Sequence, residues 1–236
     1  MNVIITGASS GIGYETVKEF CTRKILNIII IARSSAKLEQ MKVEFEKKFH
    51  KVKIHPLEID LSEKNIDKKL TILIKKKLNS KIDVIVNNAG LLINKPFEKL
   101  SDKDWSDVFE VNLFGVVRLI RAVMPFLGKQ NKSHIVNISS MGGFQGAEKF
   151  AGLSAYSTSK GALCTFSECL AKEFEPKNIA VNCLALGAVQ TKMLKQAFPK
   201  FKAPVTASQM AKFIVDFALS SHHLMNGKVI PVALKN

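Results

Sequence analysis

The sequence is poor in acidic residues and lacks the marks of a membrane-bound or exported protein. It has 20 Asp and Glu against 35 Lys and Arg, which gives a net charge of +15. No apolar run reaches the roughly 18 residues that a membrane-spanning helix requires. The chain also starts directly in an apolar run, residues 3–5, with no basic leader before it. We therefore expect no membrane anchor, no signal peptide and a cytoplasmic location.

Cysteine pairs with metal-ligand or disulfide spacing are also missing. The four cysteines are Cys21, Cys164, Cys169 and Cys183, and none forms a Cys-x-x-Cys pair. Because three of them lie in apolar or helical stretches, buried free thiols in a reducing compartment are the simplest interpretation. We expect neither disulfides nor a metal site.

The positive charge alone would favour an anionic partner such as nucleic acid. However, the lysines are scattered through residues 42–53, 64–81 and 192–202, and no nucleic-acid recognition motif accompanies them. A solvated, lysine-rich surface is the favoured interpretation, and we expect no nucleic-acid partner. The positive field would still attract phosphorylated or acidic ligands.

Seven short apolar runs, rich in β-branched residues, recur along the chain. They span residues 3–6, 27–32, 52–58, 83–87, 134–139, 180–186 and 228–232. Continuous apolar runs of this kind are typical of strands in a parallel sheet that is covered on both faces. No linker, repeat or low-complexity segment divides the chain, so we expect one domain over residues 1–236.

Helical patterns separate these runs. Residues 13–23, 37–49 and 65–78 carry apolar residues at three- and four-residue spacing, and 104–127 and 157–174 are longer and more apolar. The alternation predicts a single-domain, doubly wound Rossmann fold with a seven-stranded parallel sheet and helices on both faces. Its dinucleotide-binding half would span residues 1–133, and its catalytic and substrate half 134–236. Ligands of such folds bind at the carboxyl ends of the strands.

A glycine-rich run follows the first strand. Gly7, Gly11 and Gly13 are spaced for a tight turn, a close backbone approach to a pyrophosphate and close packing of helix on strand. The start of the next helix would add unpaired N–H groups and a partial positive charge. We therefore expect this run to hold the phosphates of a dinucleotide. The predicted contacts are Gly7, Ser9, Ser10, Gly11, Ile12 and Gly13.

The second strand ends without the carboxylate that would hold an unphosphorylated ribose. Arg33 stands there instead and offers a guanidinium fork for a 2′-phosphate, to which Ser34 can add a hydroxyl donor. NADP(H) is therefore favoured over NAD(H). The alternative is that Arg33 is a solvated loop arginine.

Further cofactor contacts are predicted at the ends of the third and fourth strands. Asp60 can accept a hydrogen bond from the adenine amino group or, equally well, cap the following helix. The run Asn87-Asn88-Ala89-Gly90 is small enough for the backbone to pass along the cofactor, and its Asn side chains can fasten neighbouring strands. The predicted contacts here are Asp60, Leu61, Asn87, Ala89 and Gly90.

Tyr156 and Lys160 lie one helical turn apart and share a face. A phenol with a pKa near 10 is a poor acid–base catalyst at neutral pH, and a nearby ammonium would lower that pKa. Lys160 could also bind the ribose of a nicotinamide nucleotide. A Tyr-x-x-x-Lys pair by itself is more often an ordinary helix surface.

Two further polar residues complete a candidate catalytic set. Ser140, at the end of the fifth strand, can hold a substrate carbonyl oxygen beside Tyr156, or it is a capping serine. Asn112 lies within an apolar helical stretch. It can bind a main-chain carbonyl and a water that connects Lys160 to solvent, or it is a satisfied core asparagine.

These motifs together resemble the short-chain dehydrogenase/reductase family over nearly the whole chain. Residues 6–13 match its TGxxxGxG, 87–90 its NNAG and 156–160 its YxxxK. The resemblance implies an Asn112-Ser140-Tyr156-Lys160 tetrad, in which Tyr156 exchanges a proton with the substrate while hydride passes between the nicotinamide and the substrate carbon. It also implies a small carbonyl or alcohol substrate, a homodimer or homotetramer, and NADP preference from Arg33. A dinucleotide-binding sensor or scaffold without turnover is the alternative.

The chain departs from the family pattern in three places. Leu186-Gly187 replaces a Pro-Gly, which would loosen that turn, although Val189 and Thr191 match the usual nicotinamide-side contacts. The stretch 141–155 is about three residues longer than usual and glycine-rich, so we expect a mobile wall of the substrate pocket. The tail 231–234 lacks the family's acidic, glycine-rich ending. An apolar pocket, or simply a packed lid, is predicted from Phe144, Phe150, Leu153, Met193, Leu194, Phe198 and Phe201.

Overall fold

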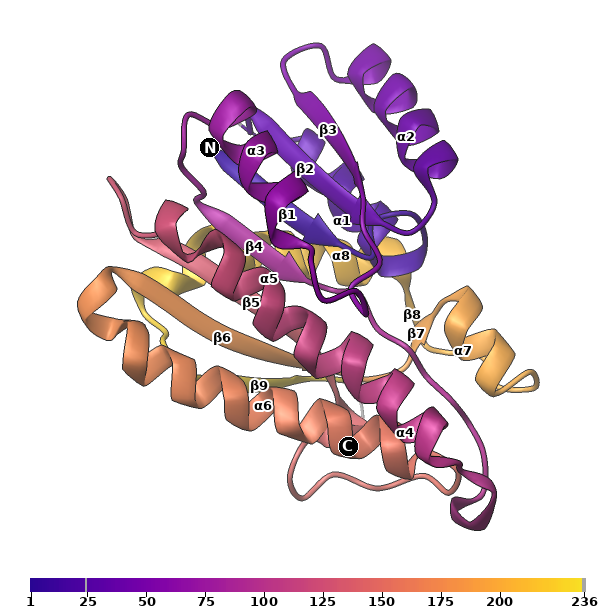
Figure 1. Cartoon of the computed structure of the whole chain (residues 1–236). Coiled ribbons are helices and arrows are strands. Elements are labelled where there is room, and N and C mark those ends of the chain that lie inside the picture. The colour runs from indigo at the N-terminus through magenta and orange to yellow at the C-terminus, as the bar shows by residue number, and fades with distance from the viewer. Residues whose placement is uncertain (24, 235–236) are drawn as a thin grey trace.

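The computed structural model describes residues 1–23 and 25–234, and seven parallel strands form the centre of the molecule (Figure 1). The strand order is β3-β2-β1-β4-β5-β6-β9. Each predicted strand is found within one residue of its predicted ends, because strands covered on both faces are continuously apolar. Their bounds are β1 (Asn2–Thr6), β2 (Asn27–Ala32), β3 (Lys53–Glu58), β4 (Val84–Asn87), β5 (Ser133–Ser140), β6 (Ile179–Leu186) and β9 (Val229–Val232).

Alternate strand residues face two separate helical layers. Val3 and Ile5 belong to the core beneath α1 (Gly11–Cys21), α2 (Ser35–Lys48) and α8 (Ala207–Ser220). Ile4 belongs to the core on the other face, beneath α3 (Asp67–Lys77), α5 (Gly115–Val123) and α6 (Ser154–Phe174). The doubly wound Rossmann fold is confirmed, with helices on both faces (Figure 1).

The long helix predicted over 104–127 is not continuous. It consists of α4 (Asp102–Phe109), a π-helical turn (Glu110–Phe114), α5 and a short 3₁₀ turn (Met124–Phe126). A capping box between Ser101 and Asp104 starts α4. At the start of α5, a Cβ on Gly115 would lie 2.8 Å from both the Cβ and the carbonyl oxygen of Leu61. A single π turn lies within an otherwise α-helical apolar pattern, so the sequence does not distinguish it from a continuous helix.

The segment between β6 and β9 contains structure that we did not predict. A two-residue strand β7 (Val189–Gln190) pairs in parallel with β8 (Val205–Thr206), and α7 (Lys192–Ala197) lies between them. Figure 1 shows this unit at the edge of the molecule. The helix α8 follows, with a capping box between Thr206 and Gln209.

All four cysteines are free thiols; Cys21, Cys164 and Cys183 are buried and Cys169 is exposed. In residues 1–23 and 25–234, no helix is both long and apolar enough to cross a membrane. Within the same ranges, no three His, Cys, Asp or Glu side chains are grouped to hold a metal ion.

Candidate active site

The predicted motifs gather at the carboxyl edge of the sheet, because all seven strands run parallel. The glycine-rich run follows β1, Arg33 follows β2, Asp60 follows β3, the Asn-Asn-Ala-Gly run ends β4, and Ser140 ends β5. The segment after β6 meets the first motif, since Thr191 Cγ2 lies 3.5 Å from the Cβ position of Gly11.

The turn after β1 requires glycine at three positions. Gly7 has φ +65°, and a Cβ on it would lie 2.8 Å from Cα of Ala89. A Cβ on Gly13 would overlap the carbonyl oxygen of Gly7. Gly11 has φ +56°, but the space around it is open apart from Thr191. The first and third glycines therefore pack backbone against backbone, and the second leaves room for a ligand.

The residues of this turn fit the phosphates of a dinucleotide. Helix α1 begins at Gly11, its N-cap Ser10 makes no side-chain capping bond, and its first turn holds no acidic residue. Its first N–H groups and positive dipole end are therefore available to an anion. Ser9 and Ile12 are partly buried on either side.

Asparagine side chains link the strands around this glycine-rich turn, as expected. Asn88 Nδ2 donates to the carbonyl oxygen of Thr6 at 3.0 Å, and Thr6 Oγ1 accepts from the N–H groups of Asn88 and Ala89 at 3.0 Å each. Asn87 Nδ2 donates to Asn137 Oδ1 at 2.8 Å. Sequence reasoning missed Thr6 and Asn137, although both are polar residues in apolar strands, and that exception was a usable signal.

The side chains of Arg33 and Asp60 differ in how many bonds they already make to the protein, and so in how well they can bind a ligand. Arg33 is exposed, and no carboxylate in the described part of the chain pairs with it. Ser34 is the N-cap of α2 and makes no side-chain capping bond. Asp60 Oδ1 accepts from Ser62 N at 3.0 Å and from Ser62 Oγ at 2.8 Å. It therefore closes a local turn, whereas the next helix begins later, at Asp67.

Several predicted cofactor contacts have buried side chains. Leu61 is 6% exposed, Asn87 1% and Val189 5%, so these three can offer mainly backbone atoms to a ligand. Gly187 N donates to the Val232 carbonyl oxygen at 2.9 Å. This bond ties the turn after β6 to β9, and the loosening expected from the missing proline stays a prediction.

Tyr156 lies in the first turn of α6 and is partly buried. A side-chain hydrogen bond with Ser140 lowers the pKa of Tyr156, but burial outweighs it and the pKa is raised overall. This direction is opposite to our expectation that a nearby ammonium would lower the pKa of Tyr156. Ser140 Oγ also accepts from Gly142 N at 3.2 Å, so this serine caps a turn as well as facing the tyrosine.

Lys160 is held by β5 through both its side chain and its backbone. The residue is 3% exposed, and Nζ donates to the Ile138 carbonyl oxygen at 2.7 Å. Burial lowers the pKa of Lys160 to about 8. Its own carbonyl oxygen accepts from Ser139 Oγ at 2.8 Å. Ser139 is thus a structural residue, which leaves Ser140 as the hydroxyl beside Tyr156.

Asn112 is fully buried in the π-helical turn. Its Oδ1 accepts from Leu91 N at 2.7 Å, and its Nδ2 donates to Leu91 O and Ser159 Oγ, both at 2.9 Å. The predicted bond to a main-chain carbonyl is confirmed, and the amide is also a satisfied core group. Extra-residue turns of this type recur at functional sites. Ser159, which we did not predict, is the second partner.

The glycine-rich stretch after Ser140 packs closely against other segments near both of its ends. A Cβ on Gly143 would lie 2.5 Å from the carbonyl carbon of Lys160 and from Gly161 N. A Cβ on Gly152 would overlap Asn94 Oδ1. Both ends of this loop therefore pack closely against other segments, and the mobile wall stays a prediction.

Part of the predicted apolar set faces solvent. Phe150 is 52% exposed, Phe201 50% and Met193 39%, whereas Leu153 is buried. A pocket of about 670 Å³ lies between residues 96–98, 142–143, 149–154 and 157–158, and Phe150 and Leu153 line it. Ser140, Tyr156 and Lys160 do not line this pocket.

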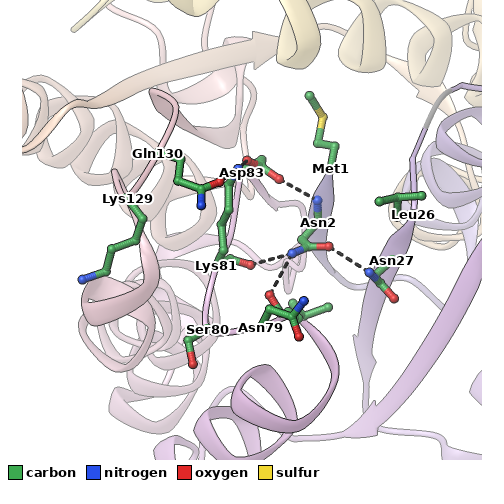
Figure 2. A pocket seen from close by; sticks show the side chains of 11 residues that line it. Met1, Asn2, Leu26, Asn27, Asn79, Ser80, Lys81, Asp83, Lys129 and Gln130 are labelled. Atoms are coloured by element: carbon green, nitrogen blue, oxygen red, sulfur yellow. Dashed lines mark hydrogen bonds and ion pairs between the residues drawn. The ribbon is translucent and has the colours of Figure 1, made fainter.

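A second pocket, of about 530 Å³, lies at the opposite edge of the sheet (Figure 2). Asn2 starts β1 and Asn27 starts β2, and Figure 2 shows Asn2 bonded to Asn27, Lys81 and Asp83. This pocket belongs to the amino ends of the strands, so it is separate from the predicted site.

The comparisons with known proteins agree with this geometry. The family model for short chain dehydrogenases matches residues 1–202. The chain is 36% identical to the 3-oxoacyl-[acyl-carrier-protein] reductase of Aquifex aeolicus, covering 80% of this chain and 74% of that protein. It is 33% identical to the NADP-dependent 3-hydroxy acid dehydrogenase of Schizosaccharomyces pombe, covering 92% of this chain and 86% of that protein.

A solved short chain dehydrogenase from Shigella flexneri, in complex with NADP, has the same fold. The TM-score is 0.89 at 25% identity, covering 98% of this chain and 95% of that one. Together these likenesses make the protein an oxidoreductase that acts on alcohol or carbonyl groups with a nicotinamide dinucleotide. The chain belongs to the short chain dehydrogenase family.

Proposed function

We propose that the protein is an NADP(H)-dependent oxidoreductase that interconverts a carbonyl and a secondary alcohol, with Tyr156 as its acid–base. The observation that carries this proposal is the convergence of two hydroxyl groups, Ser140 at the end of β5 and Tyr156 in the first turn of α6, next to the buried Lys160. A phenol and a second hydroxyl that converge at the end of β5 can both form a hydrogen bond with one substrate oxygen.

The proton chemistry follows from these side chains. In reduction, the Tyr156 hydroxyl donates its proton to the substrate oxygen, which Ser140 holds in position. The ammonium of Lys160, one helical turn away, favours the negative charge that the phenol oxygen then carries. When bound, the nicotinamide supplies the hydride for reduction or accepts it in oxidation. Lys160 also binds the nicotinamide ribose, and Asn112 supports a water that returns the proton to Tyr156.

The cofactor preference rests on Arg33. Its exposed guanidinium lies at the end of β2 without a carboxylate partner in the described residues, so it is free to bind a 2′-phosphate. The relative from Schizosaccharomyces pombe is NADP-dependent, and the structure from Shigella flexneri was solved with NADP. Gly187, Val189 and Thr191 complete the nicotinamide side. NAD(H) is the alternative cofactor.

We further propose an acyl substrate whose reacting oxygen is on carbon 3. The two relatives reported above act on a 3-oxoacyl group and a 3-hydroxy acid. Such substrates are anionic or bound to a phosphorylated carrier. Residues 176–215 contain no acidic residue, and Lys192, Lys195, Lys200 and Lys202 are all exposed there. These charges suit an anionic substrate.

A fluorescence titration with NADPH and, separately, NADH tests the cofactor assignment. Tight NADPH binding with weak NADH binding is the expected result. The glycine-rich turn after β1 can bind the phosphates of both cofactors, whereas Arg33 favours only NADPH. Preference for NADH would contradict the role of Arg33, and binding of neither would contradict the proposed function. Light scattering of the same sample tests the expected homodimer or homotetramer.

A further inference from the structure

Three chain segments meet at one side chain, Asn94. Its Nδ2 donates to the carbonyl oxygen of Ala197, the last residue of α7, at 2.9 Å. Its Oδ1 packs against Gly152, where a Cβ would overlap it. The neighbouring Lys95 N donates to the Gly152 carbonyl oxygen at 3.0 Å. The segment after β4 is thus joined both to α7 and to the loop after Ser140.

Each of these segments starts at a functional group. The segment that carries Asn94 follows Gly90, and the loop that ends near Gly152 follows Ser140. Helix α7 is capped by Thr191, which contacts the Gly11 position of the cofactor turn. One amide therefore couples the loop from the catalytic serine to the helix that starts beside the dinucleotide glycines.

The contact is specific for asparagine and glycine. Gly152 has φ +83° and no room for a Cβ, so another residue there would displace Asn94. The amide nitrogen faces a carbonyl oxygen at Ala197, and an aspartate would place an oxygen against it and repel it. Apart from these partners Asn94 is exposed, and it reaches none of Ser140, Tyr156 or Lys160 by a hydrogen bond among the described residues.

We propose that Asn94 is a positioning residue for the substrate. It holds α7 against the loop of residues 141–153 and so fixes the spacing of these two segments without touching the reacting atoms. This inference rests on the proposed function, because it assigns the substrate to the space between these two segments. It predicts that loss of the amide weakens substrate binding and leaves the chemical step and cofactor binding unchanged.

Limited trypsin digestion followed by mass spectrometry measures how often α7 detaches from the fold, and it needs no substrate. Lys192, Lys195, Lys200 and Lys202 provide cleavage sites in and just after this helix. We expect cleavage at these sites to be about three- to tenfold faster in Asn94→Ala and Asn94→Asp, which is the factor that one net hydrogen bond supplies. The matched control is Asn131→Ala, an exposed asparagine before the amino end of β5.

Steady-state kinetics on the same proteins measure the positioning role. KM for the carbonyl substrate should rise about three- to tenfold in both Asn94 variants. Their kcat and NADPH dissociation constant should stay within about twofold of wild type, which a general loss of structure would not allow.

Two results would overturn the inference and differ in cause. If wild type is active but the Asn94 variants match Asn131→Ala in cleavage rate or in KM, Asn94 does not position the substrate. If wild type binds NADPH and yet turns over no carbonyl substrate, the proposed function fails, and the positioning role fails with it.

Discussion

Asn112 Oδ1 and Lys160 Nζ both lie 3.5 Å from the point where a Cβ of Gly90 would stand. The Oδ1 atom uses one lone pair for Leu91 N, and Nζ uses one proton for the Ile138 carbonyl oxygen. Each atom therefore keeps hydrogen-bonding capacity next to a residue without a side chain. We expect a water to bridge the two atoms beside Gly90 and to carry protons toward Tyr156.

Gly90→Ala tests this bridge. A methyl group at 3.5 Å from its neighbours makes ordinary van der Waals contact, so the melting temperature should stay near that of wild type. The same methyl group occupies the space for the water, and kcat should fall roughly tenfold as the proton path is lost. Stopped-flow turnover measures the change in kcat. A thermal melt and an NADPH titration of the same variant check that stability and cofactor binding are unchanged. An unchanged kcat would show that no water at this position takes part.

Arg33→Asp should shift the cofactor preference from NADPH toward NADH. The change removes a phosphate clamp and adds an acceptor for the ribose hydroxyl groups, and each effect is on the order of 1–3 kcal/mol. We expect the ratio of the two dissociation constants to change by at least about 30-fold. The control is Lys129→Asp, which changes the charge equally at the opposite edge of the sheet (Figure 2). The same ratio in both variants would make Arg33 a solvated loop arginine.

Acid should destabilise the fold through His134. This residue is fully buried, one ring nitrogen is 2.9 Å from the Ala218 carbonyl oxygen, and burial lowers its pKa to about 4. The unfolded chain takes up the proton near pH 6.5, whereas the folded chain resists it until about pH 4. The free energy of unfolding should therefore fall by about 1.4 kcal/mol for each pH unit between 6.5 and about 4.

Urea unfolding at pH 7.5 and 5.5 measures this loss. Burial also lowers the pKa of His222, which adds to the loss in the same direction. The His134→Gln variant should lose much of the pH dependence, whereas a change at the exposed His50 should keep it. If stability is equal at the two pH values, His134 does not stay neutral in the fold.

Turnover should decline as the pH rises through about 8. Burial lowers the pKa of Lys160 to about 8, so the ammonium is present below that pH and is lost above it. Without the positive charge, the phenol oxygen of Tyr156 loses its stabilising partner, and the rate should fall by up to about tenfold per pH unit. A pH–rate profile from 6 to 10 measures this. A profile that stays flat between pH 8 and 10 would contradict a cationic role for Lys160.

The strands and the site motifs could be predicted because each rests on a local rule. A parallel strand buried on both faces is a continuous apolar run, and ligand-binding residues follow its carboxyl end. For this reason β2 was predicted to the residue, and Ser140 was correctly placed at the end of β5. Both patterns can be recognised without knowledge of the rest of the chain.

The remaining features depend on contacts between distant segments. The π turn around Asn112 adjoins the close approach of Gly115 to Leu61, a contact between segments far apart in sequence. The pKa of Tyr156 depends on how deeply the folded chain buries the ring, which composition does not reveal. The role of Asn94 appears only once α7 and Gly152 are brought together.

The central claim is that Tyr156 is the proton donor, and Tyr156→Phe tests it most directly. The chain contains only one other tyrosine, Tyr14, whose hydroxyl bonds to Glu44 on the opposite layer of helices, so Tyr14→Phe is the matched control. NADPH binding by fluorescence and NADPH oxidation with a carbonyl substrate are measured on wild type and both variants. The account predicts that all three bind NADPH within about twofold and that only Tyr156→Phe loses turnover, by at least about 100-fold. Turnover retained by Tyr156→Phe at the level of Tyr14→Phe would contradict the account.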